Sequence, residues 1–325
     1  MRLRRSLGVC AVVAALALLA GGCSGSSAGR HGHRPGGRIG ALASWDRARL
    51  LAALPYGLAP SRVPRPGQTA SPHTAGTKSA LRVGALFEHD ASGDHFCTAS
   101  VVSSPGKDLL ITAAHCIHGG KGSGYTTDIV FIPGYRGGQE PYGVWTVARL
   151  LVAPQWADSS DPDYDVGFVV LQPHNGENIE QVLGANQLGT DDGYRYLVHV
   201  TGYPDSANSP ITCVNWTSRQ SATQLKFACQ GYTGGTSGSP WVSRFSSRSR
   251  TGTIVGVIGG YQEGGDTPSV SYSVQLNPGI RQLYQQAAAL SASTPASTPA
   301  STPASTPAST PASAAPSSPA ASSAG

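Results

Sequence analysis

The sequence has 325 residues, 41 of them glycine and 24 proline, and a formal net charge of +5. The charge is unevenly distributed: residues 1–23 hold three arginines and no acid, residues 24–80 hold eight basic residues and one aspartate, and residues 81–325 hold twelve basic and seventeen acidic residues. Only the acidic region has the periodicity of a folded core, so we expect one domain and no nucleic-acid binding.

The first 23 residues have the features of an export signal. Three arginines precede an apolar stretch, Val9 to Ala20, that is too short to span a bilayer comfortably and is typical of a signal peptide. Small residues then lead to Cys23, which resembles the bacterial lipobox, although Ala20 stands where leucine is preferred. We expect an exported protein that is anchored to the outer face of the cell membrane through lipidated Cys23, with ordinary secretion as the alternative.

Residues 24–80 are basic and rich in glycine, proline and serine. One short apolar stretch, Ser44 to Leu54, is compatible with one or two helical turns. We interpret the region mostly as a linker; the alternative is a pro-segment that docks on the acidic domain.

Residues 81–290 consist of short apolar and β-branched runs separated by glycine, proline and aspartate turns. Runs of this length and spacing are typical of an antiparallel barrel and predict the all-β class. Twelve strands are expected, over residues 81–87, 95–102, 109–112, 128–132, 144–152, 166–171, 196–202, 211–216, 224–229, 241–243, 253–259 and 270–275.

The domain is predicted to end in a helix that packs on a barrel. Asn277-Pro278 is a helix-start signal, since it combines a capping residue with proline at the first helical position. Apolar residues then recur on one helical face, at Ile280, Leu283, Tyr284, Ala287 and Ala288. Residues 291–325 contain five Ser-Thr-Pro-Ala copies; this composition cannot form a core and predicts a disordered tail.

Ser237 lies in the glycine-rich stretch GGTSGSP, residues 234–240. Glycines on both sides allow a sharp turn that can aim the N–H groups of Gly235 and Ser237 at one point. Serine is a weak nucleophile at neutral pH and needs a general base, together with a third group that orients the base.

A base and an acid both occur upstream of the serine. His115 follows the apolar run 109–111, and Asp165 directly precedes the apolar run 166–171, with Asp161 and Asp163 as rival acids. The order His, Asp, Ser differs from that of the α/β-hydrolases, in which the serine comes first.

The TAAHC, DYDVGF and GTSGSP stretches together resemble the trypsin-like, chymotrypsin-fold serine peptidases over roughly residues 81–290. GTSGSP is most similar to the bacterial glutamyl-endopeptidase-like branch. The resemblance implies two six-stranded antiparallel β-barrels with a C-terminal helix, and a triad of His115, Asp165 and Ser237 in the cleft between the barrels. It further implies hydrolysis of a protein or peptide substrate through an acyl-enzyme, an oxyanion hole formed by Gly235 and Ser237, and no cofactor.

Four of the six cysteines fall in the domain and allow three pairings. The resemblance implies that Cys97 pairs with Cys116, which leaves Cys213 for Cys229. The alternative is metal binding by a histidine–cysteine cluster. We expect no metal, because exported chains favour disulfides and no Cys-x-x-Cys spacing is present. That cluster would comprise His95, Cys97, His115, Cys116 and His118.

Two positions depart from trypsin. Thr236 stands where trypsin has the aspartate that pairs with the new N-terminus, so activation by that ion pair is not expected. Gly231 stands where trypsin carries the pocket charge, which removes the usual basis of Arg/Lys specificity. The substrate pocket is expected to be lined by Gly231, Thr233, Gly259 and Tyr261. Glutamyl specificity in the related branch relies on a pocket histidine, and the corresponding residues 255–261 contain none. The alternatives are hydroxyl groups from Tyr261, Thr233 and Ser239 that bind the substrate side chain, or an uncharged pocket for medium apolar side chains.

Two alternatives to an endopeptidase stay open at this stage. One is a catalytically weak relative that binds peptides or envelope components, and the other is an esterase that uses the same triad. We expect a monomer in each case.

Overall fold

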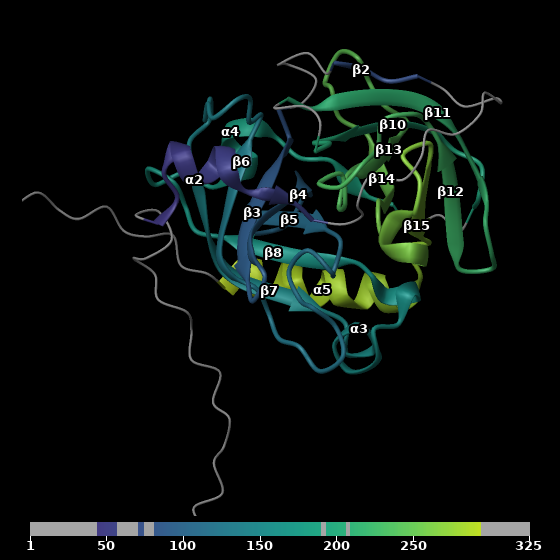
Figure 1. The fold of residues 1–325 in the computed structure, drawn as a ribbon, viewed down its shortest axis with the longest axis horizontal. Helices are drawn as coiled ribbons and strands as arrows, with labels where there is room; N and C mark the ends of the chain where they lie inside the picture. Colours follow the sequence, from purple (N-terminus) through teal and green to yellow (C-terminus); the bar gives the residue numbers. More distant parts are fainter. Residues whose placement is uncertain (1–43, 57–70, 75–80, 190–192, 206–208, 294–325) are drawn as a thin grey trace, which may run out of the picture. The chain divides into compact units, whose positions relative to one another are not determined.

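The computed structural model describes residues 44–56, 71–74, 81–189, 193–205 and 209–293 (Figure 1). The predicted signal peptide, Cys23 and the Ser-Thr-Pro-Ala repeats, apart from their first residue Ser293, lie outside these residues. None of the helices described is long and apolar enough to cross a membrane.

Six antiparallel strands form a closed barrel. The order is β4-β3-β6-β7-β8-β5, and pairing of Ser100 with Ile111 and of Val101 with Leu110 joins β4 to β5 and closes the barrel. Every residue of β5 and β8 is buried, because the barrel interior covers one face and the rest of the domain covers the other. The strands are β3 (Val83–Asp90), β4 (Gly93–Val101), β5 (Leu109–Thr112), β6 (Thr127–Pro133), β7 (Trp145–Val152) and β8 (Gly167–Leu171).

The second sheet is a curled half-barrel of six antiparallel strands in the order β15-β12-β11-β10-β13-β14. The two edge strands, β14 and β15, are connected by isolated hydrogen bonds and not by a ladder. Val257 N–H donates to Ser273 Oγ (2.9 Å), and Gly259 N–H donates to Tyr272 O (3.1 Å). The strands are β10 (Leu197–Gly202), β11 (Ile211–Arg219), β12 (Gln224–Ala228), β13 (Pro240–Ser243), β14 (Thr253–Val257) and β15 (Val270–Val274). All twelve predicted strands are present, and the predicted double barrel is confirmed, with the second barrel curled and not closed by a ladder.

Three two-residue strands were not predicted. β1 (Leu54–Pro55) pairs in parallel with β4, β2 (His73–Thr74) pairs with β11, and β9 (Gln187–Leu188) pairs in parallel with β14. Pairings of this length depend on the neighbouring strand and leave no periodicity in the sequence.

The C-terminal helix α5 (Pro278–Ser293) seals the junction of the two sheets. Ile280, Leu283 and Ala287 join one buried cluster with Phe168 of the first barrel and Val257 of the second sheet. Asn277 Oδ1 accepts a hydrogen bond from Ile280 N–H (3.0 Å), as expected of the helix-start signal.

The folded chain extends past residue 290, where the tail was predicted to begin. Ser291 is 1 % exposed, and its hydroxyl accepts a hydrogen bond from Gly106 N–H (3.1 Å) and contacts Ser104 Oγ (2.9 Å). Composition alone misplaces this boundary because the partners of Ser291 lie about 185 residues upstream.

The remaining helices are short. The helical turns expected within 44–54 are present as α2 (Arg47–Ala52). Leu50 of this helix and Trp45, which precedes it, are buried with Phe87 and Ile132. Part of the region interpreted as linker is therefore folded against the first barrel. The other helices are α3 (Pro154–Ser159), α4 (Ile179–Leu183) and the 3₁₀ helices η1 (Pro162–Tyr164) and η2 (Tyr261–Gly264).

Candidate active site

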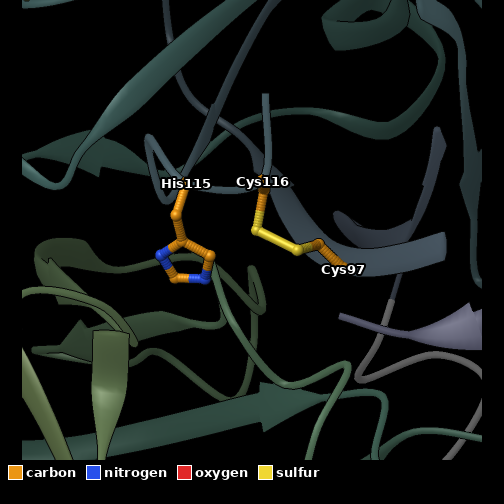
Figure 2. A group of neighbouring side chains, drawn as sticks. All are labelled: Cys97, His115 and Cys116. Atoms are coloured by element: carbon orange, nitrogen blue, oxygen red, sulfur yellow. A yellow bond between two sulfur atoms is a disulfide. The ribbon is translucent and has the colours of Figure 1, made fainter. Parts of the chain in front are cut away.

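His115 is held by the turn that follows β5. A disulfide between Cys116 and Cys97 of β4 fixes this turn to the barrel wall, and the imidazole lies beside the disulfide (Figure 2). A second disulfide joins Cys213 to Cys229. These are the pairs that the resemblance implied. His115, Cys97 and Cys116 form a compact group of potential metal ligands, but their sulfurs are bonded to each other, so the group lacks the thiolates that a metal would need.

Asp165, at the end of η1, is the acid that meets His115. Its Oδ2 lies 2.8 Å from His115 Nδ1 and accepts Gly260 N–H (2.8 Å), while its Oδ1 accepts the His115 backbone N–H (3.0 Å). The rival acids have other partners: Asp161 caps η1, and Asp163 accepts from Gln224 Nε2 (2.7 Å). Three hydrogen bonds therefore hold one buried carboxylate against the imidazole.

Charge and hydrogen bonding outweigh burial in this pair. Burial disfavours both charges, but the neighbouring histidine and the two backbone N–H groups lower the pKa of Asp165 below its usual value. Burial likewise lowers the pKa of His115, and the Asp165 carboxylate more than reverses this, so the pKa of His115 is raised. An ionised carboxylate only accepts hydrogen bonds, so Nδ1 carries the imidazole proton and Nε2 is left as the basic nitrogen.

Ser237 reaches this region through contacts between the second sheet and β4. Thr98 N–H donates to Ser237 O (2.8 Å), and Thr98 Oγ1 donates to Gly235 O (2.9 Å). Gly238 has a φ of +81°, and a Cβ there would lie 2.1 Å from Thr98 O, so only glycine fits this approach. The serine turn is thus pressed against the strand and turn that carry His115.

No hydrogen bond between Ser237 Oγ and His115 Nε2 is present, and Nε2 is buried without a hydrogen-bond partner among the described residues. The Tyr56 ring is stacked on His115, with ring centroids 5.4 Å apart and planes at 28°. Catalytic hydrogen bonds are often long in the absence of substrate and tighten when it binds. The structure therefore brings His115 and Asp165 together and holds the turn that carries Ser237 against Thr98 and Ala113, without completing the chain of hydrogen bonds.

The four pocket residues have different environments. Thr233 Oγ1 donates to Asp205, and Gly231 has a φ of +82° that favours glycine. Gly259 contacts Asp165 closely, since a Cβ atom added at Gly259 would lie 3.0 Å from Asp165 Oδ2. Tyr261 is 43 % exposed and packs edge-on against Tyr272. None of the four carries a charge.

Several residues around the site were not found from the sequence. Gly260, whose N–H binds Asp165, is 95 residues away in the chain, and Thr98, which binds the serine turn, is 137 residues from Gly235. Gln224 connects Asp163 to Tyr261, because its Oε1 accepts Tyr261 N–H (3.2 Å). These contacts are made by backbone groups or by common polar residues, and no local pattern marks them.

Comparisons with known proteins identify similar chains. The family model described as Trypsin matches residues 72–278. The protease Anisep from Arthrobacter nicotinovorans has 28 % identity and a TM-score of 0.59, over 65 % of this chain and 96 % of that one. The thermostable serine protease AL20 from an extremophilic microorganism has 26 % identity and a TM-score of 0.59, over 65 % and 99 %.

Two further matches are weaker. A Glu endopeptidase has 14 % identity and a TM-score of 0.55, over 68 % of this chain and 98 % of that one, and shares the fold alone. The curated "Extracellular metalloprotease" of Bacillus subtilis (strain 168) is 25 % identical over 179 residues, 53 % of each chain. The chain thus spans about half the length of this curated relative.

Proposed function

The chain belongs to the trypsin family, and from this membership we propose that it is an exported serine endopeptidase that uses Ser237, His115 and Asp165. The observation that carries the proposal is the buried His115–Asp165 pair, in which the 2.8 Å contact fixes the proton on Nδ1 and leaves Nε2 basic. This is the arrangement that a general base for a serine nucleophile requires.

In the proposed reaction, Ser237 Oγ adds to the carbonyl carbon of the scissile peptide bond while its proton passes to His115 Nε2. The carbon–nitrogen bond then breaks as His115 returns the proton to the leaving amine, and water repeats the sequence to release the acid. Asp165 stays ionised and stabilises the imidazolium. The N–H groups of Gly235 and Ser237 bind the oxyanion, each contributing about 3 kcal/mol to the barrier reduction.

The serine turn is supported without a buried N-terminal amine. Thr236 occupies the position of the activating aspartate, and its hydroxyl donates to Thr233 O (2.7 Å), while Ser239 Oγ donates to Thr236 O (2.6 Å). Hydrogen bonds within the turn thus supply the support that trypsin obtains from an ion pair. We propose that a new N-terminal amine is not needed for activity.

The substrate is a protein or peptide whose side chain fits an uncharged pocket formed by Gly231, Thr233, Gly259 and Tyr261. The absence of a charge in this set argues against selection of Arg or Lys by an ion pair. Glutamyl specificity, as in the Glu endopeptidase among the structural neighbours, is the alternative, with the Tyr261 hydroxyl as a hydrogen-bond donor, since the Thr233 hydroxyl already donates to Asp205.

Export is supported by the predicted signal peptide and by two disulfides, which form in oxidising compartments. We propose anchoring through acylated Cys23 and a monomeric enzyme. Mass spectrometry of the membrane fraction tests the anchor, because a mature N-terminus other than acylated Cys23 rejects it.

The nucleophile is tested with a fluorophosphonate probe, followed by digestion and mapping of the label. We expect the label on Ser237, none on the Ser237→Ala protein, and cleavage within a diverse peptide library. Labelling with turnover of esters but not of peptides would indicate the esterase. A folded protein that binds peptides but neither labels nor cleaves, both with and without residues 44–56, would indicate the binding module.

A further inference from the structure

Residues 44–56 enter the cleft where the proposed reaction takes place. β5 pairs with β4 only at Ser100 and Val101, which leaves the other half of that β4 edge open. β1 fills the open half, with Leu54 opposite His95 and Pro55 opposite Phe96. The Tyr56 N–H continues the ladder by donating to Phe96 O (2.9 Å).

The carbonyl group of Tyr56 ends at the proposed oxyanion hole. Gly235 N–H donates to Tyr56 O over 2.8 Å, so this donor is already occupied by the chain's own backbone. The Tyr56 ring covers His115 on one side and contacts His95 edge-on at 5.7 Å. A substrate carbonyl cannot take the hydrogen bond of Gly235, and a leaving group cannot approach His115, while Tyr56 is in place.

We infer that residues 44–56 form an intramolecular inhibitor, docked on the β4 edge with the Tyr56 carbonyl at Gly235, and that activity requires its displacement. The inference rests on the proposed function, because it assigns Gly235 and His115 to the reaction. It adds a partner for the cleft, which is a basic, aromatic segment of the same chain.

The way Tyr56 is bound favours an inhibitor over a substrate. The side chain of a residue whose carbonyl is attacked should enter the substrate pocket of the second sheet, but the Tyr56 ring lies on His115. The residues before it pair with β4 of the first barrel.

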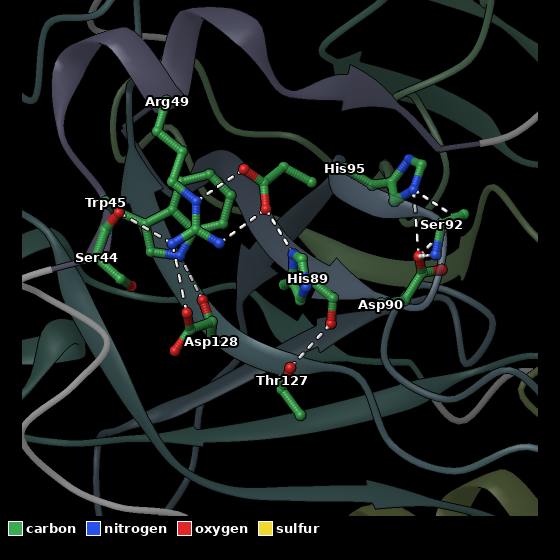
Figure 3. Close-up of polar contacts among 10 residues, drawn as sticks. Ser44, Trp45, Arg49, His89, Asp90, Ser92, His95, Thr127 and Asp128 are labelled. Atoms are coloured by element: carbon green, nitrogen blue, oxygen red, sulfur yellow. Dashed lines mark hydrogen bonds and ion pairs between the residues drawn. The ribbon is translucent and has the colours of Figure 1, made fainter.

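An anchor away from the catalytic residues holds the segment (Figure 3). Arg49 forms two hydrogen bonds with Asp94 (2.8 and 2.7 Å) and an ion pair with Asp128 (3.3 Å), and its guanidinium lies 3.8 Å above the Trp45 ring. Trp45 is buried against Phe87, and its indole N–H donates to Asp128 O. The hydrogen bonds with Arg49 are the main reason why the pKa of Asp94 is lowered to about 2. The ion pair between Arg49 and Asp94 therefore stays charged at any pH at which His115 can act as a base.

The anchor provides a test that leaves the proposed catalytic residues unchanged. In the full chain, Arg49→Glu removes the pair with Asp94 and places like charges together. We expect fluorophosphonate labelling of Ser237 to be about tenfold faster than in the wild type, the factor that loss of roughly 1.4 kcal/mol of segment docking gives. Arg47→Glu is the matched control, since it makes the same charge change at an exposed position of α2, where the Arg47 side chain lies against Gly138 but forms no ion pair with the described residues. It should label at the wild-type rate.

Two further measurements keep the test decisive if Arg49→Glu folds poorly. Tyr56→Ala should also speed labelling, because it uncovers His115. A synthetic peptide of residues 44–56 added to the Arg49→Glu protein should slow labelling, and the same peptide carrying Arg49→Glu should not.

The outcomes separate the inference from the proposed function. Equal labelling of the wild type, Arg49→Glu and Tyr56→Ala proteins, with no effect of the peptide, overturns the inhibitor and leaves the nucleophile intact. Ser237-dependent cleavage of the Tyr56–Gly57 bond, with a released segment that does not inhibit, shows a substrate and also overturns it. Failure of every variant to label rejects the proposed function, and the inhibitor with it.

Discussion

Asp165→Asn removes the charge of the buried carboxylate with almost no change in shape. An asparagine cannot replace all three hydrogen bonds. With its oxygen at the Oδ2 position, it accepts from His115 Nδ1–H and Gly260 N–H, but its NH₂ group faces the His115 backbone N–H. In the flipped orientation, the NH₂ group faces Gly260 N–H and Nδ1, which favours the imidazole tautomer with its proton on Nε2.

In both orientations, the expected increase in the activation free energy of hydrolysis exceeds the expected loss in the free energy of unfolding. One unsatisfied buried donor costs about 1–3 kcal/mol, which lowers the Tm of a domain of this size by roughly 2–12 °C. The loss of the correct tautomer and of the imidazolium partner is worth about 10⁴ in kcat in a serine protease triad, or about 5.5 kcal/mol of barrier. At 25 °C the variant should therefore be folded and nearly inactive.

The assay is peptide hydrolysis as a function of pH, measured in the Arg49→Glu chain so that the inhibitory segment does not mask the rate. Activity requires neutral His115 and falls as the pH drops through its pKa. The Asp165 carboxylate raises that pKa and burial lowers it, so the acid limb of Asp165→Asn should move to lower pH. Asp163→Asn is the control, because Asp163 binds Gln224 and does not contact His115. A wild-type rate with an unshifted limb in Asp165→Asn would refute the assignment.

Other predictions concern stability and activation. Reduction of the Cys97–Cys116 bond, whose cysteines are 19 residues apart, should lower the free energy of unfolding by about 3 kcal/mol. Denaturant titration with and without reductant measures this loss, and non-reducing peptide mapping tests the pairing. Free thiols at these positions would contradict the prediction. A chain that begins at Ser71 keeps β2 and lacks residues 44–56, so it should label rapidly, and acetylation of its N-terminal amine should change the rate little; strict dependence on that amine would reject the role given to Thr236. Glu88 is completely buried and faces no cation among the described residues; burial raises its pKa to about 8, and the neighbouring Thr126 hydroxyl offsets this only in part. Its folded pKa exceeds the unfolded value, so the folded state is progressively disfavoured as the pH rises from about 4.5 to 8. Glu88→Gln should therefore gain more stability at pH 8 than at pH 5 in thermal unfolding, and an equal gain at both would count against a protonated Glu88.

The sequence by itself determined the class of the domain and the types of reactive side chain. Short apolar and β-branched runs bounded by turn residues were enough to locate twelve strands, because strands buried in a barrel leave such runs in the chain. The helix start at Asn277-Pro278 was equally readable, since capping depends on neighbouring residues. The glycine-flanked Ser237 and the two upstream motifs indicated a His, Asp, Ser order.

Only the tertiary structure decided which of those groups meet. The sequence offered Asp161, Asp163 and Asp165 as acids within five positions, and the Gly260 N–H and the His115 turn select Asp165. The boundary at Ser291 and the docking of residues 44–56 also depend on contacts made many residues away, such as Arg49 with Asp94 and Tyr56 with Gly235. A composition rich in glycine and proline predicts a linker because it measures the average of a segment. In this chain a few buried side chains and one open strand edge fold part of that segment over the proposed active site.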